Sequence, residues 1–309
     1  MLIKLCILLV TLNLLLIQST AVAQSCESQR VRLQMLGTGG PELLNERAST
    51  GYLIWLDDKA RIIVDAGPGS LQRFKQSGAK YEDIRAIFFS HFHVDHSADL
   101  AAYVKGGFFS KRSVNLPLYG PSGDTFILST DDFVKKLFSA TEGVYPYLNP
   151  NIDPQSRSEY KLQPHTIQWS YRELDSKEIY KDDDFRVISV SVHHGPFPAL
   201  AYRVETAGCV ISFTGDMSGR LNTMPDLAQG SDLLVAHNAI PEDATGVPQL
   251  LHMKPSMIGK IAGEAKVKKL LLTHMMERSI NRQDESVDLI RKNYQGPVIF
   301  PRDLESFHP

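Results

Sequence analysis

The sequence has little net charge, little cysteine and no repeated or low-complexity segment. Its 309 residues carry a formal net charge of −2 at pH 7, so the chain as a whole offers no electrostatic attraction to nucleic acid. The absence of a fixed-period repeat argues against an architecture built from repeats. With 43% hydrophobic and 22% charged residues, the composition is that of a globular protein and not of a disordered one.

Only one stretch is apolar enough to suggest a membrane or export segment, and it lies at the N-terminus. Lys4 precedes an apolar run over 5–17, and Ala21-Val22-Ala23 offers a small-residue cleavage site. The run is shorter than the roughly 20 residues that a spanning helix needs. We therefore predict a secretory signal peptide over 1–23 and a periplasmic or secreted mature chain, with an uncleaved anchor as the alternative.

The three cysteines do not form a metal motif. Cys6 leaves with the predicted signal peptide, and Cys26 and Cys209 remain in a compartment where disulfides form. One bridge is permitted, but the sequence does not place the two thiols near each other. Cys209 lies in an apolar, strand-like run, so a buried thiol explains it equally well.

A nucleotide-binding fingerprint is also missing, although one loop invites that interpretation. The run over 31–36 alternates apolar and polar residues, as a strand does, and stops at Gly37-Thr38-Gly39-Gly40-Pro41. No helical pattern follows this loop. Neither a dinucleotide fingerprint nor a phosphate-binding P-loop is therefore completed.

What the sequence does contain is a dense group of metal-ligand side chains over 91–96. His91, His93, Asp95 and His96 place three imidazoles and one carboxylate in six residues, directly after an apolar run typical of a buried strand. His91 and His93 stand two apart and share one side of an extended loop, whereas Asp95 and His96 must diverge. Imidazole and carboxylate suit ions such as zinc, so this loop predicts a site for up to two metal ions.

Further candidate ligands follow apolar, strand-like runs at three later places. They are His193 or His194, Asp216 and His274. Loops at strand ends often carry chemistry, and four such ends with metal-ligand side chains are hard to assign to chance. Strand alternation favours His194 over His193, because the two side chains point to opposite faces.

The pattern of apolar runs predicts one domain over 24–309. Strand-like runs dominate before residue 100 and again over 185–236, and helical patterns intervene, which predicts two packed sheets with helices outside. The segment 143–163 is rich in Pro, Asn, Asp and Ser and is expected to be a long loop or flap. A helix capped by Ser256 is expected to extend to residue 265 and to lead into a strand over 269–273.

The order of these motifs resembles that of the metallo-β-lactamase superfamily, on its arylsulfatase and ribonuclease Z side, over nearly the whole mature chain. The resemblance is carried by Leu36-Gly37-Thr38-Gly39-Gly40-Pro41, Asp65-Ala66-Gly67-Pro68-Gly69, the segment 90–96, His194-Gly195-Pro196, Phe213-Thr214-Gly215-Asp216 and Leu272-Thr273-His274. It implies an α/β fold, a four-layered αβ/βα sandwich of two mixed β-sheets flanked by helices. It also implies two Zn²⁺ ions, with Mn²⁺ or Fe²⁺ as other candidates. The implied ligands are His91, His93 and His194 for the first ion, Asp95, His96 and His274 for the second, and Asp216 between them.

This ligand set predicts a hydrolase. Two divalent ions that share a water lower its pKa and supply hydroxide, which Asp95 would orient while it holds its metal. His252, 22 positions before His274, falls where this branch of the superfamily has a histidine that protonates the leaving group. Asp65 is expected to orient a ligand histidine by a hydrogen bond, and His237 is a second candidate for such a role.

The function predicted from the sequence is an exported dizinc hydrolase of a small ester, similar to arylsulfatases or phosphodiesterases. A ribonuclease Z-like tRNA 3′-endonuclease is the alternative. The export signal and the charge balance disfavour it, and so does His252-Met253-Lys254, which replaces the His-Ser-Thr of that family. A lactonase and a non-catalytic metal-binding protein are further alternatives.

The expected partner is accordingly a small-molecule ester and not a nucleic acid. No membrane span is expected after removal of the signal peptide, and a homodimer is left open. Lys105, Arg203 and Lys254 are candidates for binding the anionic group of the substrate.

Overall fold

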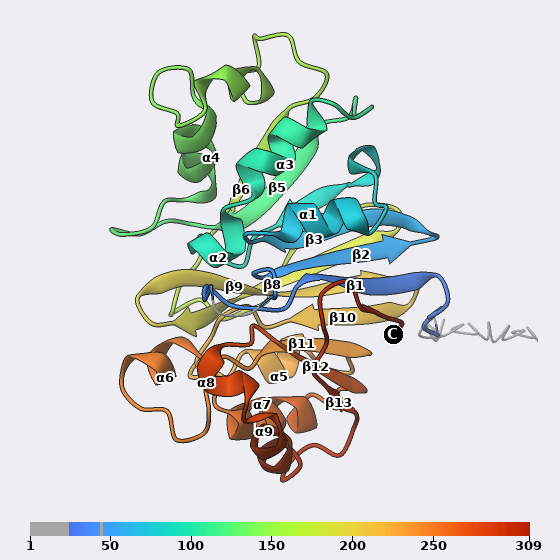
Figure 1. The fold of residues 1–309 in the computed structure, drawn as a ribbon, viewed down its shortest axis with the longest axis vertical. Helices are drawn as coiled ribbons and strands as arrows, with labels where there is room; N and C mark the ends of the chain where they lie inside the picture. The colour runs from blue at the N-terminus through green and yellow to red at the C-terminus, as the bar shows by residue number, and fades with distance from the viewer. Residues whose placement is uncertain (1–24, 44–45) are drawn as a thin grey trace, which may run out of the picture.

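Two seven-stranded sheets pack face to face, and helices cover their outer surfaces (Figure 1). The computed structural model describes residues 25–43 and 46–309, so the predicted signal peptide lies outside the described residues. Across these two ranges no helix combines the length and apolar character that a membrane crossing requires. The four layers confirm the predicted fold class of two mixed sheets flanked by helices.

The first sheet has the strand order β14-β1-β2-β3-β4-β5-β6. Its strands are β1 (Val31–Gly37), β2 (Gly51–Leu56), β3 (Lys59–Ala66), β4 (Ala86–Phe88), β5 (Leu116–Pro121), β6 (Leu162–Ile167) and β14 (Ser306–Phe307). β1, β2 and β3 form an antiparallel meander, whereas β3 to β6 run parallel. β2 and β4 are buried along their whole length, as expected of strands covered on both faces.

The second sheet has the order β13-β12-β11-β10-β9-β8-β7. Its strands are β7 (Lys177–Lys181), β8 (Phe185–His194), β9 (Phe197–Thr206), β10 (Cys209–Phe213), β11 (Leu233–His237), β12 (Lys269–Thr273) and β13 (Val298–Ile299). β8 and β10 are both antiparallel to β9, and β10 to β13 run parallel. The C-terminal ends of β8, β10, β11 and β12 therefore meet at one edge of the sheet.

Helices form the two outer layers. Those on the first sheet are α1 (Ser70–Gln76), α3 (Leu100–Gly107) and α4 (Thr130–Phe138), and those on the second are α5 (Met224–Leu227), α7 (Pro255–Glu264) and α9 (Gln283–Ile290). Short elements complete the described chain: α2 (Val94–Ser97), α6 (Val247–Leu251), α8 (Glu277–Ile280) and the 3-10 helices η1 (Tyr81–Asp83) and η2 (Pro146–Asn151). Figure 1 shows α2, α6 and α8 at the edge where the metal-ligand candidates gather.

Apolar side chains fill the space between the layers. Tyr52 and Phe213 lie between the sheets, Tyr103 and Phe138 lie under the helices of the first sheet, and Ile261 lies under those of the second. Each of these side chains is at most 2% exposed. Burial on both faces of each sheet supplies the main stabilising free energy and fixes the edges that carry the polar site.

Two local features differ from, or add to, the sequence-based prediction. α7 begins at Pro255 with Lys254 at its N-cap, so the cap predicted at Ser256 is wrong; proline suits the first helical position because it has no N–H to satisfy. The Ser256 hydroxyl instead donates to Glu242. The segment 143–163 contains η2, which packs against α3 and α4, with Leu148 buried.

A disulfide joins Cys26, just before β1, to Cys209, the first residue of β10. The sequence left this bond open. It links the N-terminal segment of the first sheet to the second sheet, at the end of β10 away from Asp216.

Candidate metal site

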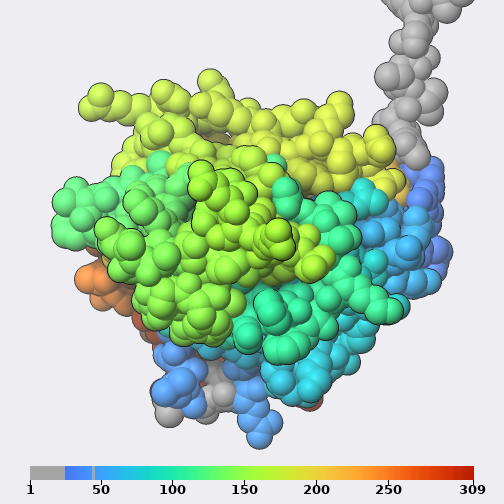
Figure 2. Space-filling model, turned by 90° about the horizontal axis from the view of Figure 1, so that it is seen from above, coloured from blue at the N-terminus to red at the C-terminus, as the bar shows by residue number. Residues whose placement is uncertain are grey.

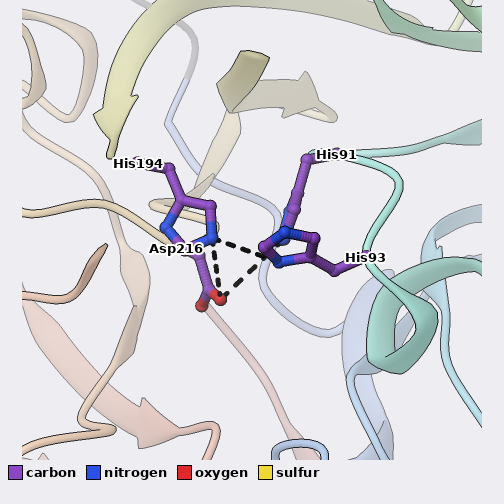
Figure 3. Close-up of side chains that lie close together, drawn as sticks. All are labelled: His91, His93, His194 and Asp216. Atoms are coloured by element: carbon purple, nitrogen blue, oxygen red, sulfur yellow. Dashed lines mark hydrogen bonds and ion pairs between the residues drawn. The ribbon is translucent and has the colours of Figure 1, made fainter. Parts of the chain in front are cut away.

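The candidate ligands come together because their strands end at the same edge of the molecule. His91 and His93 follow β4, Asp95 and His96 lie in α2, and His194 ends β8. The remaining two, Asp216 and His274, follow β10 and β12. Figure 3 shows His91 and His93 of the loop after β4, His194 at the end of β8 and Asp216 after β10 pointing toward one another.

The first group of ligands is His91, His93, His194 and Asp216, whose ligand atoms all lie within 4.8 Å of one another. His194 Nε2 is 3.3 Å from His93 Nδ1 and 3.7 Å from Asp216 Oδ2. His91 Nε2 is 3.9 Å from the same carboxylate oxygen. This is the set that the family resemblance implied for one ion.

The second group contains His96, His274, Asp216 and His237, again within 4.8 Å of one another. Asp95 joins it, since its Oδ2 lies 3.1 Å from His274 Nε2 and 3.5 Å from His96 Nε2. Asp216 belongs to both groups. Its Oδ2 is 3.5 Å from His96 Nε2, and its Oδ1 is 3.4 Å from His274 Nε2.

The donor set fits metal binding. His91 Nε2 and His96 Nε2 are buried and have no hydrogen-bond partner among the described residues, which is costly for polar nitrogen unless another ligand satisfies it. Burial lowers the pKa of His194 to about 4, so this ring is neutral and its lone pair is available. Imidazole nitrogens and carboxylate oxygens together are suitable ligands for zinc and similar ions.

The charge of the cluster also favours a cation. Burial acts to lower the pKa of His96, but the carboxylates of Asp95, Asp65 and Asp216 raise it well above the ordinary value. Burial acts to raise the pKa of Asp216, but His274 and neighbouring imidazoles hold it well below its usual range. The three carboxylates thus attract positive charge, and metal ions compete with protons for these ligands.

Asp65 contacts His96 of the second group at Nδ1, the ring nitrogen that does not face the other candidate ligands. Its Oδ2 lies 2.9 Å from His96 Nδ1, and its two oxygens accept hydrogen bonds from the Ser90 amide and hydroxyl. Such outer partners fix the tautomer and direction of a ligand ring. Asp65 itself has a left-handed backbone, with φ 58°, a conformation that Asp tolerates better than most residues. Sequence analysis missed Ser90, although its place directly before the ligand loop was a usable signal.

His237 lies next to Asp216 in a buried chain of polar groups. Its Nδ1 is 2.7 Å from Asp216 Oδ1, and its Nε2 is 2.9 Å from the Tyr52 hydroxyl. That hydroxyl is 2.7 Å from Thr273 Oγ1. Tyr52 was not foreseen, because in the sequence it is one aromatic residue within an apolar strand.

His252 stands at the cluster without a hydrogen-bonding acid of its own. Its Nδ1 is buried, 3.6 Å from Asp216 Oδ1, and has no hydrogen-bond partner among the described residues. Burial lowers the pKa of His252 to about 3, so the ring is neutral near pH 7. An anionic group bound beside it would raise that pKa and make the ring a proton donor.

Several other candidates lie elsewhere. His193 points away from the cluster, with its Nδ1 2.8 Å from Ser218 Oγ. Arg203 donates to Glu205 and to backbone carbonyls, and Lys105 lies over the Phe108 ring beyond α3.

Arg278, four residues after His274, was missed by the sequence analysis. Its guanidinium is partly buried, and its positive charge interacts with Asp216 and with His252.

Close backbone packing sets the position of the ligand loops. A Cβ on Gly67 would lie 2.0 Å from the Asp95 carbonyl oxygen, and a Cβ on Gly40 would lie 2.8 Å from His274 Cε1. Glycine is therefore required where the turn after β3 passes the ligand loop and where the loop after β1 passes His274. His274 has φ 55°, a strained backbone of the kind often found at functional sites.

The comparisons with known proteins agree with this geometry. The profile of the beta-lactamase superfamily domain matches residues 60–275, most of the chain. The protein belongs to this superfamily, which confirms the resemblance seen in the sequence.

Relatives with similar sequences over most of the chain are named ribonuclease Z. The protein from Thermoplasma acidophilum is 25% identical over 303 residues, covering 87% of this chain and 93% of the relative. That from Pseudomonas putida is 24% identical over 283 residues, covering 80% of this chain and 86% of the relative.

Solved structures support the fold. Human tRNase Z, short form, has a TM-score of 0.67 at 20% identity and covers 89% of this chain and 98% of its own. The metallo-beta-lactamase fold protein YhfI from Bacillus subtilis has a TM-score of 0.68 at 21% identity, with coverages of 90% and 99%. Zinc-bound PqqB from Methylobacterium extorquens has a TM-score of 0.62 at 12% identity, covering 90% of this chain and all of that one.

These relatives correct the function predicted from the sequence. An exported hydrolase of small esters was the main prediction, but the relatives named ribonuclease Z favour the alternative, a tRNA endonuclease. The ligand set could not decide this point, because the same metal ligands serve carboxylate, sulfate and phosphate ester hydrolysis. The net charge was a poor guide, since an average over the whole chain hides local basic surfaces. The expectation that excluded a nucleic acid partner conflicts with the same relatives.

Proposed function

We propose that this protein is a metal-dependent phosphodiesterase that cleaves RNA in the manner of ribonuclease Z. The observation that carries the proposal is the convergence of seven histidine and aspartate side chains, among them His91 and His96, whose buried Nε2 atoms have no hydrogen-bond partner in the described part of the chain. The similarity to proteins named ribonuclease Z over most of the chain supports RNA as the substrate class.

His91, His93, His194, Asp95, His96, His274 and Asp216 would hold two divalent ions, with zinc as the first candidate. Such ions lower the pKa of a bound water and neutralise charge on a phosphate. Asp216 lies between the two groups, and the carboxylate of Asp95 faces the same space. Asp65 and His237 keep ligand rings and the Asp216 carboxylate in place.

Two further side chains would act on the substrate. Arg278 is partly buried, its Nε–H donates to the Ala239 carbonyl, and its positive charge lowers the pKa of His252; the rest of its guanidinium would bind a phosphate oxygen. His252, with its unpartnered Nδ1, would donate a proton to the leaving oxygen once the phosphate has raised its pKa.

The test is cleavage of precursor transfer RNA by the metal-loaded protein, with and without a chelator. We expect chelator-sensitive cleavage near the 3′ end of the mature transfer RNA. The Asp216→Ala variant should lose this cleavage, and it should also lose at least one bound metal ion per chain. A His193→Ala variant is the control, because His193 is the neighbour of the candidate ligand His194 in β8 but faces away from the cluster. A metal-loaded protein that leaves RNA intact, or one whose cleavage survives the chelator, would overturn the proposal.

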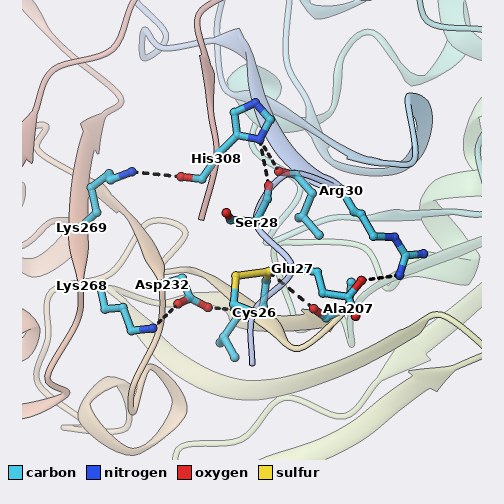
Figure 4. The surroundings of a disulfide bond; sticks show 12 residues. Cys26, Glu27, Ser28, Arg30, Ala207, Asp232, Lys268, Lys269 and His308 are labelled. Atoms are coloured by element: carbon cyan, nitrogen blue, oxygen red, sulfur yellow. Dashed lines mark hydrogen bonds and ion pairs between the residues drawn. A yellow bond between two sulfur atoms is a disulfide. The ribbon is translucent and has the colours of Figure 1, made fainter. Parts of the chain in front are cut away.

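We also infer that the folded chain works in an oxidising compartment, so that precursor transfer RNA serves in the test as a probe of RNA cleavage and not as the RNA that the chain meets in the cell. The Cys26–Cys209 disulfide supports this location, since such bonds persist outside reducing cytoplasm (Figure 4). Blocking free thiols at cell lysis, followed by mass analysis, tests the inference. A protein isolated with both thiols free would refute the location without affecting the proposed substrate.

A further inference from the structure

Exposed aromatic rings cluster on the outer face of the first sheet, at the C-terminal end of α3. Phe108 and Phe109 are 65% and 78% exposed, and Tyr147 of η2 is 62% exposed. α3 and η2 contact each other, and Figure 2 shows the segments that contain them side by side on this face. Grouped exposed aromatic side chains are unusual on a protein surface and often mark a binding site.

A lysine lies among these rings. The Lys105 ammonium is 4.6 Å from the centre of the Phe108 ring, 5.0 Å from Phe109 and 5.4 Å from Tyr147. Cation–π contacts at these distances hold the four side chains as one unit. We call Lys105, Phe108, Phe109 and Tyr147 the aromatic patch.

The aromatic patch borders a cavity of about 700 Å³. Among its lining residues, Lys105, Arg112 and Arg157 are cationic and Glu159 is the single acid. Arg112 is only 3% exposed, and its guanidinium donates to the backbone carbonyls of Tyr81, Ile84 and Asn115; within residues 25–43 and 46–309 it has no carboxylate partner. Positive charge is therefore fixed in the wall of the cavity and is offset by one acid.

We propose that the aromatic patch and its cavity bind a single-stranded segment of RNA. Aromatic rings stack on bases of any sequence, and neighbouring cations bind the phosphates that connect them. Bases in a duplex are already stacked, so exposed rings of this kind select unpaired nucleotides. The proposal rests on the proposed function and extends it by a second contact with the substrate.

The position of the aromatic patch suits such a contact. α2 carries Asp95 and His96, and α3 follows it directly. The eight residues of α3 span about 12 Å, so the aromatic patch lies at the end of α3 that is one helix length away from α2. Figure 1 shows α2 and the end of α3 on the same outer side of the first sheet. A bound strand would thus be held on the side from which α2 approaches the cluster.

The test is binding of a fluorescein-labelled oligouridylate to the full mature chain, measured by fluorescence anisotropy in the presence of a chelator that stops turnover. The double variant Phe108→Ala/Tyr147→Ala removes two rings, and Lys105→Ala removes the charge. Control variants are Phe126→Ala, which removes a ring 78% exposed on another loop, and Lys59→Ala, which removes an exposed lysine at the start of β3. Circular dichroism and thermal unfolding establish that every variant is folded.

We expect the double variant to bind oligouridylate roughly tenfold more weakly, and Lys105→Ala to reduce the salt dependence of binding by about one phosphate contact. The controls should bind like the unsubstituted protein, and all variants should hydrolyse bis(p-nitrophenyl) phosphate at the unsubstituted rate. Equal binding by the double variant and the controls would overturn the inference, as would equal binding of duplex and single strand. A protein that binds oligouridylate through the aromatic patch but cleaves no RNA would refute the proposed function and leave this inference standing.

Discussion

At the residue scale, a series of three buried polar side chains, His237, Tyr52 and Thr273, controls the Asp216 carboxylate. The carboxylate accepts from His237 Nδ1–H, which leaves His237 Nε2 as an acceptor for the Tyr52 hydroxyl. The hydroxyl of Thr273 then donates to Tyr52. Only one assignment of donors and acceptors satisfies all three hydrogen bonds. This series of hydrogen bonds therefore fixes both the tautomer of His237 and the direction of the Asp216 carboxylate.

Removal of the Tyr52 hydroxyl tests this series of hydrogen bonds. Tyr52→Phe leaves two buried polar groups without their partner, which should cost about 1–3 kcal/mol of unfolding free energy. Loss of a partner behind the metal ligands should also weaken metal binding roughly 10- to 100-fold, as measured by competition with a chromophoric chelator. Tyr160→Phe is the control, because its hydroxyl donates to the Val104 carbonyl away from the cluster. If both variants bind metal equally well, the hydrogen bonds of Tyr52 have no role in positioning the metal ligands.

His252 provides a second prediction at this scale. If it protonates the leaving oxygen, His252→Ala should slow cleavage of diesters with poor, alkoxide-like leaving groups by about 10²- to 10⁴-fold. Diesters of p-nitrophenol release p-nitrophenolate, which leaves without needing a proton, so the rate of their cleavage should be nearly unaffected. The measurement is kcat for a series of diesters graded by leaving-group pKa. Equal losses across the series would assign His252 a structural role.

At the scale of elements, the turn after β3 and the start of α2 are packed backbone to backbone. A Cβ on Gly67 would overlap the Asp95 carbonyl oxygen. We expect Gly67→Ala to displace the ligand loop, to lower the unfolding free energy by about 1–3 kcal/mol and to reduce bound metal below that of the unsubstituted protein. Metal analysis and denaturant unfolding provide the measurement.

Gly106→Ala is the matched control for this prediction. Apart from the adjoining residues and the backbone of α3 itself, no described atom lies within 4 Å of the added Cβ, and the position is inside α3, where alanine is favoured by about 0.5–1 kcal/mol. If Gly67→Ala binds as much metal as the unsubstituted protein, the turn after β3 accommodates the Cβ without displacing Asp95, and the prediction is wrong.

The elements also show how far the sequence predicts the structure. The strand β12 has the predicted bounds, and the runs before the candidate ligands are strands, because alternating or continuous apolar residues report burial directly. The short strands β5 and β6 were not foreseen; Leu116–Pro121 and Leu162–Ile167 are held by pairing with neighbours far away in the chain. Contacts of that kind leave no local periodicity. The same limit applied to Tyr52 and Arg278, whose roles depend on which strand ends meet.

At the scale of the whole molecule, a disulfide adds a covalent link to the apolar packing between the two sheets. The disulfide closes a loop between residues 183 positions apart, and in the chain-entropy treatment such a bond contributes roughly 3–5 kcal/mol of stability. We expect Cys26→Ser/Cys209→Ser to lose about that much in denaturant unfolding. Metal affinity should be unchanged, because Cys209 and Asp216 flank opposite ends of β10. A double variant that is as stable as the unsubstituted protein, or that loses its metal while folded, would contradict this prediction.

The metal-ligand cluster has a mechanical consequence beyond chemistry. His91, His93, Asp95 and His96 follow strands of the first sheet, whereas His194, Asp216 and His274 follow strands of the second. Ions bound by both sets would connect the two sheets at one edge of the sandwich, and the disulfide connects them covalently at the other end of β10. A chain fastened at both ends resists sliding of one sheet over the other, and its two halves should melt as a single cooperative unit as long as both fastenings are intact.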